Sequence, residues 1–220
     1  MVKQVTIDWS GGQVSGRLTG KGPDGILLAH GSGTNQDHPF MVLLRDGLAS
    51  AGHTVLTFNY PYTERGSKSP DRAEKLVECH RGAADYFRPK VDHLFLAGRS
   101  MGGRMATYLV AEGDEASGVL LYAYPLHPAG KPERLRIAHF SDVTVPMMFF
   151  QGTRDALSKM DLFERHIATL PNADVEILEG ASHSFRGGGW TPESMVERLV
   201  ADSSRWIAAV SSGASRGVQA

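Results

Sequence analysis

The segment Gly98-Arg99-Ser100-Met101-Gly102 constrains the fold of this chain more than any other. It follows the apolar run 93–97, which is typical of a buried strand, and it precedes residues 103–110, whose pattern is typical of a helix. Strand, G-x-S-x-G and helix together form the tight, strained turn called a nucleophile elbow. Both glycines are needed because a side chain there would collide with the neighbouring strand and helix. We therefore predict that the Ser100 hydroxyl projects above the carboxyl edge of a sheet.

The rest of the chain alternates short apolar runs with helical patterns, and this alternation predicts the fold class. The expected strands are 4–7, 13–18, 25–29, 54–58, 93–97, 118–123, 145–151 and 175–178; the expected helices are 39–51, 70–87, 103–110, 158–170 and one beginning at 192. Repeated β-α-β units predict an α/β fold with a mainly parallel sheet flanked by helices, after an opening hairpin. We expect one domain over residues 1–210 without a large cap domain, and a flexible tail over 211–220.

Three helices carry specific expectations. Phe40, Leu43, Leu44 and Leu48 share one face of the helix 39–51, so we expect that face to be buried. Ser69-Pro70 is expected to cap the helix 70–87, and Thr191-Pro192 to cap the last helix.

Composition and charge restrict the class of protein. The chain has 220 residues, enough for one full hydrophobic core, and a net charge of −1 with no basic stripe. We therefore expect no nucleic-acid partner and no membrane surface. No apolar run approaches the roughly 18 residues of a membrane span, and the N-terminus lacks a signal-peptide pattern. The expected protein is cytoplasmic, a monomer or small homo-oligomer.

A serine hydroxyl needs a general base, and that base needs an orienting group. In this fold class the chain order is serine, acid, histidine. Asp155 directly follows the strand 145–151, and His183 directly follows the last strand, in a loop of small residues. We therefore expect Ser100, Asp155 and His183 to form a catalytic triad.

Other acids compete with Asp155 for its place. Asp142 precedes its strand, Asp161 falls on a helix surface and Asp174 opens the last strand from the opposite edge. None of these positions favours contact with the carboxyl edge of the sheet. For Asp155 itself the alternative is a residue that caps a turn or helix.

An oxyanion hole needs two N–H donors, and the first is expected from Met101, which follows the nucleophile. The second is expected from the loop His30-Gly31-Ser32-Gly33, after the strand 25–29, with Ser32 the first choice and Gly33 the second. His30 is expected to order this loop through hydrogen bonds. A phosphate-binding loop is the alternative, but the Walker lysine and the G-x-G-x-x-G spacing are both missing.

The connection 125–144 is too short for a helical cap, so the site is expected to be open and shallow. His127 lies on its predicted rim, where contact with substrate and a purely structural role are both open. Arg99 is expected either to form a salt bridge or to face the crevice. Cys79 falls in the middle of a predicted helix and is expected to have a packing role. No histidine spacing indicates a metal, and no cofactor is expected.

Together these features resemble the α/β-hydrolase superfamily over residues 25–206. The resemblance rests on His30-Gly31, on the elbow at Ser100, on Gly152-Thr153-Arg154-Asp155 and on the late His183. More narrowly, residues 28–33, 37–41 and 124–128 are similar to a small lidless, dienelactone-hydrolase-like branch. They are also similar to the hydrolase-like domain of non-specific lethal complex subunit 3. True dienelactone hydrolases use a cysteine where this chain has serine.

The resemblance implies hydrolysis of a small carboxylic ester, thioester or lactone through an acyl-enzyme. The expected partner is a small-molecule acyl substrate, without a large lipid chain. Two alternatives stay open: a catalytically weak or inactive scaffold on the same fold, and an acyltransferase that uses the same serine.

Overall fold

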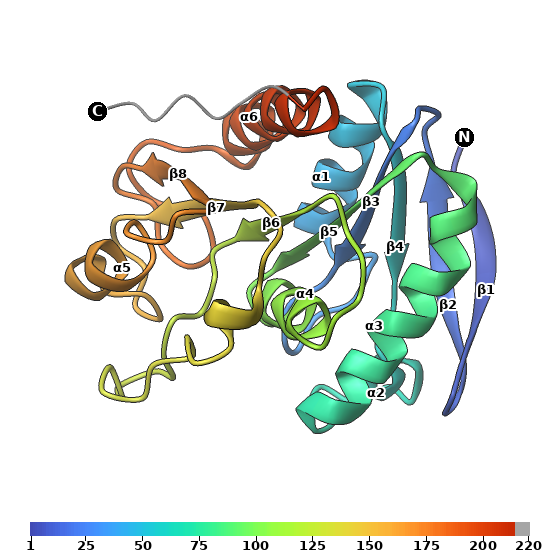
Figure 1. Cartoon of the computed structure of the whole chain (residues 1–220), viewed down its shortest axis with the longest axis horizontal. Helices are drawn as coiled ribbons and strands as arrows, with labels where there is room; N and C mark the ends of the chain where they lie inside the picture. Colours follow the sequence, from blue (N-terminus) through green and yellow to red (C-terminus); the bar gives the residue numbers. More distant parts are fainter. Residues whose placement is uncertain (214–220) are drawn as a thin grey trace.

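The computed structural model describes residues 1–213 and consists of one eight-stranded sheet with helices on both faces (Figure 1). The strands are β1 (Lys3–Trp9), β2 (Gly12–Thr19), β3 (Asp24–Ala29), β4 (Thr54–Phe58), β5 (His93–Arg99), β6 (Gly118–Tyr122), β7 (Met147–Gly152) and β8 (Ala173–Leu178). Their order across the sheet is β1-β2-β4-β3-β5-β6-β7-β8. All neighbours from β4 to β8 pair in parallel, and the β1–β2 hairpin joins β4 antiparallel. The predicted mainly parallel sheet is confirmed.

The helices divide between the two faces of the sheet. They are α1 (Pro39–Ser50), α2 (Pro61–Glu64), α3 (Ala73–Phe87), α4 (Met101–Ala111), α5 (Met160–His166) and α6 (Pro192–Ser211), with short 3-10 turns η1 (Arg88–Lys90) and η2 (Phe140–Asp142). Helices α1 and α6 pack on one face of the sheet, whereas α3, α4 and α5 pack on the other. In Figure 1 the first pair lies above the sheet and the second group below it.

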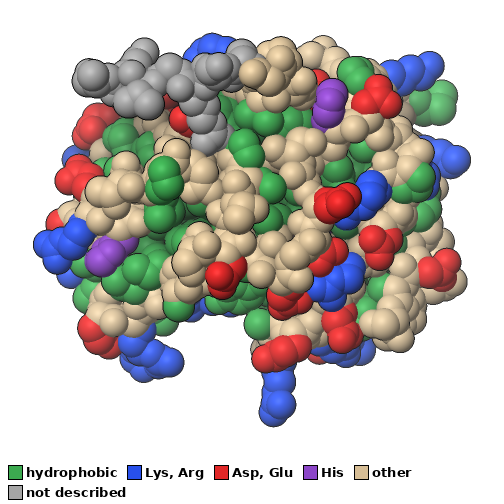
Figure 2. Space-filling view, in the orientation of Figure 1, with side chains coloured by type: hydrophobic (Ala, Val, Ile, Leu, Met, Phe, Trp, Pro, Cys, Tyr) green, Lys and Arg blue, Asp and Glu red, His purple; other side chains and the backbone are tan. Residues whose placement is uncertain are grey.

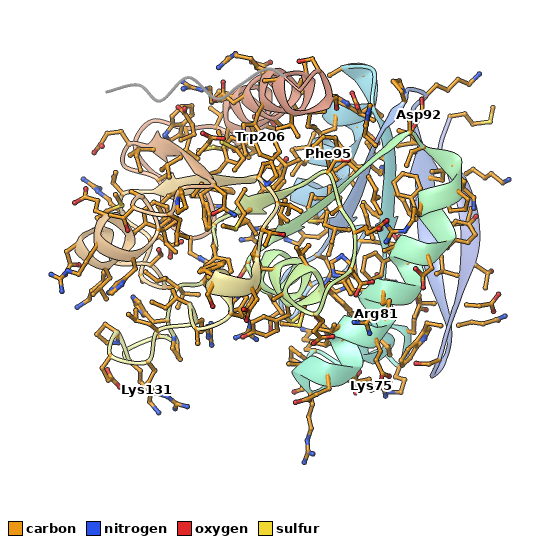
Figure 3. All side chains as sticks on the ribbon, viewed as in Figure 1. Lys75, Arg81, Asp92, Phe95, Lys131 and Trp206 are labelled. Atoms are coloured by element: carbon orange, nitrogen blue, oxygen red, sulfur yellow. The ribbon has the colours of Figure 1, made fainter. Side chains whose placement is uncertain are left out.

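The strands form because their residues are buried on both sides. Every residue of β6 and β7 is buried, as are the five central residues of β5, so these strands read as continuous apolar runs rather than alternating ones. Side chains from the two faces of β5 enter different halves of the core; Phe95, for example, packs edge-on against Trp206 of α6, with ring centroids 6.0 Å apart (Figure 3). The result is a rigid centre from which β5 delivers the elbow.

Several local expectations were wrong. Leu43 is exposed, and the buried face of α1 instead presents Met41, Leu44, Arg45 and Leu48. Helix α3 begins at Ala73, because residues 67–72 form a separate coil in which the Ser69 N–H donates to the Ser67 hydroxyl. Helix α5 is shorter than the predicted 158–170. The short helix α2 was not predicted.

The C-terminal end follows the prediction in part. Thr191 caps α6 with its hydroxyl, which accepts from the Ser194 N–H in a capping box. The helix continues to Ser211, beyond the predicted domain limit at 210, and most of the tail expected at 211–220 lies outside the described residues. Within the described part of the chain, no helix has the length and apolar character that crossing a membrane requires.

Candidate active site

Ser100 lies at the elbow between β5 and α4 in a strained backbone conformation. Its φ of 53° and ψ of −114° fall in a region that residues other than glycine rarely adopt. The conformation is held from both sides. The Ser100 N–H donates to the Tyr122 carbonyl at 2.9 Å, and the Ser100 carbonyl accepts the Arg104 N–H at 3.1 Å. The surrounding sheet and helix therefore fix the position of the hydroxyl.

The two glycines of the elbow are required by close backbone approach, as the sequence predicts. A Cβ at Gly98 would overlap the backbone of Gly102 and Gly103. A Cβ at Gly102 would overlap the Ala29 carbonyl at the end of β3. These overlaps involve main-chain atoms, which cannot move without shifting a strand or a helix.

A continuous chain of hydrogen bonds joins the three residues selected from the sequence. The Ser100 Oγ lies 2.8 Å from His183 Nε2, and His183 Nδ1 lies 2.8 Å from Asp155 Oδ2. The other carboxylate oxygen, Asp155 Oδ1, accepts the Leu157 N–H at 2.7 Å. Because a carboxylate only accepts, Nδ1 carries the imidazole proton and Nε2 is free to accept from the serine. This arrangement can remove a proton from Ser100.

Burial differs along this chain of groups. The Asp155 side chain is fully buried, whereas the His183 side chain is 21% exposed. A buried carboxylate with both oxygens hydrogen-bonded can orient the imidazole and stabilise its cation. The partly exposed imidazole can exchange protons with a substrate and with water.

The loop that carries His183 is shaped by a tight turn. The Phe185 N–H donates to the Ser182 carbonyl, the Ser182 N–H donates to the Arg186 carbonyl, and Phe185 has a positive φ of 56°. The loop rests against the end of β7, where a side chain on Gly152 would overlap the Ala181 carbonyl. The turns after β7 and β8 therefore position His183 and Asp155 together.

The rival acids lie elsewhere. Asp142 ends the 3-10 turn η2, and Asp161 is exposed on α5. Asp174 lies near the start of β8, where it accepts the Trp206 indole N–H at 2.7 Å. None of the three contacts His183, so Asp155 alone among the four meets the imidazole.

The loop after β3 is ordered by the Gly31 carbonyl. This oxygen accepts from His30 Nδ1 at 2.9 Å, from the Thr34 hydroxyl at 3.0 Å and from the Tyr62 hydroxyl at 3.4 Å. His30 Nε2 accepts the Tyr60 N–H, which fixes the tautomer, and burial lowers the pKa of His30 to about 4. The expectation that His30 orders this loop is confirmed.

These contacts determine the direction of the Ser32 N–H. In a trans peptide the N–H points opposite to the carbonyl, so fixing the Gly31 carbonyl also fixes the Ser32 N–H. Ser32 lines the same cavity as Ser100 and Met101. Gly33, by contrast, is not among the residues that line this cavity. The geometry thus favours Ser32 over Gly33 as an oxyanion donor.

Met101 is the first residue of α4, so its N–H has no carbonyl partner one turn earlier in the helix. The aligned peptides of the helix add a partial positive charge at this end. A negative charge that forms beside Ser100 is therefore stabilised from the helix side.

The expectation that His127 lies on the rim is wrong. Only 1% of the residue is exposed, and both ring nitrogens are used: Nδ1 donates to the Pro128 carbonyl, and Nε2 accepts the Lys159 N–H. Because no ring nitrogen is left for a substrate, His127 instead joins the connection 125–144 to the residues before α5. Its neighbours Pro128 and Ala129 form the rim.

Arg99 points away from the cavity beside Ser100. Its guanidinium lies 5.5 Å from the centre of the Phe40 ring and donates weakly to the His183 carbonyl at 3.4 Å. Burial lowers the pKa of Arg99, while the nearby Asp155 charge opposes this. Cys79 is buried in α3 with a raised pKa, which fits the predicted packing role.

The cavity beside Ser100 has a volume of about 350 Å³. One wall comes from residues 70–76, around the beginning of α3, and the other from the connection 125–144. Figure 2 shows the lower edge of the molecule indented between these two segments. Among residues 1–213, no group of three or more His, Cys, Asp or Glu side chains could hold a metal ion.

Comparison with known proteins agrees with this geometry. The family model described as the alpha/beta hydrolase domain matches residues 23–208. Among solved structures, a dienelactone hydrolase from Anabaena variabilis superposes with a TM-score of 0.76 at 21% identity, covering 94% of this chain and 97% of its own. A serine hydrolase without lid from Xanthomonas campestris gives 0.69 at 21% identity, covering 100% and 96%. An esterase from Pyrococcus furiosus gives 0.74 at 19% identity, covering 94% and 91%. At these identities the structural likeness shows the fold.

Proposed function

Because this chain belongs to the alpha/beta hydrolase domain family, we propose that it is a serine hydrolase that cleaves a small carboxylic ester, thioester or lactone through an acyl-enzyme. The single observation that carries the proposal is the unbroken hydrogen-bond chain from Asp155 through His183 to Ser100. A serine on a strained elbow with an oriented imidazole at 2.8 Å has the requirements of an activated nucleophile.

In the first half of the reaction, His183 Nε2 takes the Ser100 proton as Oγ attacks the acyl carbonyl carbon. The carbonyl oxygen becomes negative, and the N–H groups of Ser32 and Met101 donate to it. Asp155 stabilises the imidazolium that forms and keeps the ring in its orientation. When the tetrahedral intermediate collapses, the bond to the alcohol or thiol breaks and His183 gives that leaving group its proton.

In the second half, water takes the place of the alcohol. His183 removes a proton from water, the hydroxide attacks the acyl carbon and the bond to Ser100 Oγ breaks. The proton on His183 returns to Ser100, and the carboxylic acid leaves. The partial exposure of His183 supports this step, because water must reach Nε2.

The cavity supports a preference for short substrates. Its volume of about 350 Å³ falls at the lower end of the usual range for ligand sites, and no inserted cap domain extends it within residues 1–213. We expect p-nitrophenyl acetate and butyrate to be hydrolysed faster than long-chain lipid esters.

The test is hydrolysis of these two esters by the wild type, Ser100→Ala and His183→Ala. Each substitution should lower kcat by roughly 10⁴-fold or more, and the double variant should lose little more because the groups act as a unit. Ser117→Ala, before β6 at the opposite edge of the sheet, is the control and should keep full activity. Normal turnover by Ser100→Ala would overturn the proposal.

A second measurement separates a hydrolase from the two alternatives. A serine-directed fluorophosphonate should label the wild type and fail to label Ser100→Ala. A wild type without labelling or turnover would indicate a scaffold. Transfer of the acyl group to added alcohol in preference to water would indicate an acyltransferase.

A further inference from the structure

The cavity that contains Ser100 also contains two arginines without a carboxylate partner. Arg104 and Arg136 both line it, and neither forms an ion pair with any of the described residues. Among the other arginines of residues 1–213 that are at least partly buried, Arg17, Arg45 and Arg81 form ion pairs, whereas Arg88 and Arg99 do not. What sets Arg104 and Arg136 apart is that both line the cavity that contains Ser100.

Arg104 is placed by the helix that begins at the nucleophile. It lies four residues after Ser100, in the first turn of α4, and its N–H donates to the Ser100 carbonyl at 3.1 Å. Its side-chain Nε is buried without a hydrogen-bond partner among the described residues. Its guanidinium lies 5.8 Å from the centre of the Tyr108 ring. A guanidinium that lines a cavity without a carboxylate beside it can bind an anionic group of a ligand there.

Arg136 reaches the same cavity from the other wall. It belongs to the connection 125–144, whose outer end is marked by Lys131 in Figure 3, whereas Lys75 marks the opposite wall. One of its nitrogens donates to the Pro125 carbonyl at 3.3 Å. Burial lowers the pKa of Arg136, and the nearby Arg104 charge lowers it further. Two positive charges, one from Arg104 on α4 and one from Arg136 in the connection 125–144, therefore face the same cavity.

One acid also lines the cavity, and its charge is already balanced. Asp71 Oδ1 pairs with Arg65 at 2.7 Å and with Lys75 at 3.4 Å, although its Oδ2 is buried without a partner. Since two cations neutralise this carboxylate, the net charge facing the cavity from the two arginines stays positive.

We propose that the natural substrate is an ester or thioester whose acyl group carries a carboxylate, and that Arg104 and Arg136 bind this anion. The inference rests on the proposed hydrolase function, and it names the substrate class for the same site. Guanidinium groups suit carboxylates because they offer several N–H donors in one plane. A cavity of about 350 Å³ accommodates a short dicarboxylic half-ester with its reacting carbonyl at Ser100. The two arginines are then specificity-determining residues for the reaction.

The test uses two substrates that differ in one negative charge and one methyl group: mono-p-nitrophenyl adipate and its methyl ester, methyl p-nitrophenyl adipate. The wild type should hydrolyse the acid with a kcat/KM at least roughly tenfold higher than that of the methyl ester. Arg136→Gln and Arg104→Gln should each reduce this preference by roughly tenfold, through a higher KM for the acid. Arg134→Gln removes an exposed charge two residues from Arg136 and outside the cavity lining, so it is the matched control.

The outcomes separate this inference from the proposed function. If the wild type cleaves the methyl ester as well as the acid, or if the preference survives in the double variant Arg104→Gln/Arg136→Gln, the inference is overturned while the hydrolase function stands. If neither ester is cleaved faster by the wild type than by Ser100→Ala, the proposed function itself fails. Circular dichroism of each variant checks that the fold is retained.

Discussion

Two parts of the molecule meet at the cavity, and they are built in different ways. The turns after β3, β5, β7 and β8 are fixed by close backbone contacts at Gly98, Gly102 and Gly152, where a Cβ would overlap main-chain atoms. Buried hydrogen bonds around His30 also fix them. The connection 125–144, after β6, has no strand and only the short turn η2. We call these the platform and the wall. The platform fixes the positions of Ser100, His183 and Asp155, whereas the wall supplies Pro125, Pro128, Ala129 and Arg136 to the cavity beside them.

The largest expected effect on stability comes from one methyl group added at a glycine of the platform. Gly102→Ala in the platform places a Cβ into the Ala29 carbonyl and should destabilise the protein by about 3 kcal/mol or more. Gly130→Ala in the wall is the matched control: its φ is +67°, but an added Cβ meets nothing within 4 Å. That variant should cost about 1–2 kcal/mol from the backbone conformation alone.

Urea unfolding monitored by circular dichroism measures both costs. Equal destabilisation of the two variants would contradict the distinction between platform and wall. The activity of Gly130→Ala on the neutral ester should stay within a few-fold of the wild type.

The next effect is a dependence of stability on pH that arises from two buried histidines, His30 of the platform and His80 of α3. His80 is fully buried beside Tyr60, whose hydroxyl lies 3.2 Å from His80 Nδ1, and burial lowers the pKa of His80 to about 3. Burial likewise lowers the pKa of His30 to about 4. Both folded-state values lie below the unfolded value of about 6.5, so the unfolded state binds more protons between those limits. Stability is therefore retained above pH 6.5 and falls as the pH drops towards 4.

Each of these two histidines should contribute about 2 kcal/mol of the loss between pH 7 and pH 5. His80→Gln cannot titrate, so its free energy of unfolding should fall by about 2 kcal/mol less than that of the wild type over this interval. His166→Gln, on α5 and outside this buried group, is the control. An unchanged pH dependence in His80→Gln would contradict the prediction.

A smaller effect on stability is expected at His127, which joins the wall to the residues before α5. His127→Leu removes the donor to Pro128 and the acceptor for Lys159, and it should destabilise the protein by about 1–3 kcal/mol. Because the ring does not face the cavity, kcat/KM for the neutral ester should change only a few-fold at temperatures where the variant is folded. Thermal unfolding and ester hydrolysis on the same sample measure both. Lost activity with unchanged stability would return His127 to a role in substrate contact.

The sequence is informative about the platform for a physical reason. Ser100, Asp155 and His183 each follow an apolar run at short range, and parallel strands bring their carboxyl ends to one edge. Strand identity alone therefore brings the three residues near one another. The need for glycine at the two elbow positions could also be predicted, because the G-x-S-x-G turn brings the strand and the helix close to each other.

The wall is less predictable because its residues are chosen by tertiary contacts. Nothing in the local sequence distinguishes the buried His127 from a solvated loop histidine, or the cavity residue Arg136 from the exposed Arg134. Arg104 lies in the first turn of the helix that follows Ser100, so its closeness to the nucleophile could have been predicted from the sequence. Ser69-Pro70 misled the prediction because the dipeptide suits a helix start, yet the chain uses these residues in a coil before α3.

Hydrogen bonds join the two ends of a loop in the wall, and this determines which insertions and replacements the loop can accept. The Arg136 N–H donates to the Leu126 carbonyl at 2.8 Å, and the Tyr124 hydroxyl donates to the Arg136 carbonyl at 2.7 Å. Residues 128–135 thus leave and rejoin the molecule at a narrow, fixed neck, as in an Ω-loop. Insertions or replacements between these points alter the chain only outside the neck, so the loop can be exchanged as a module. Such an exchange would leave the hydrogen-bonded chain of Ser100, His183 and Asp155 unchanged.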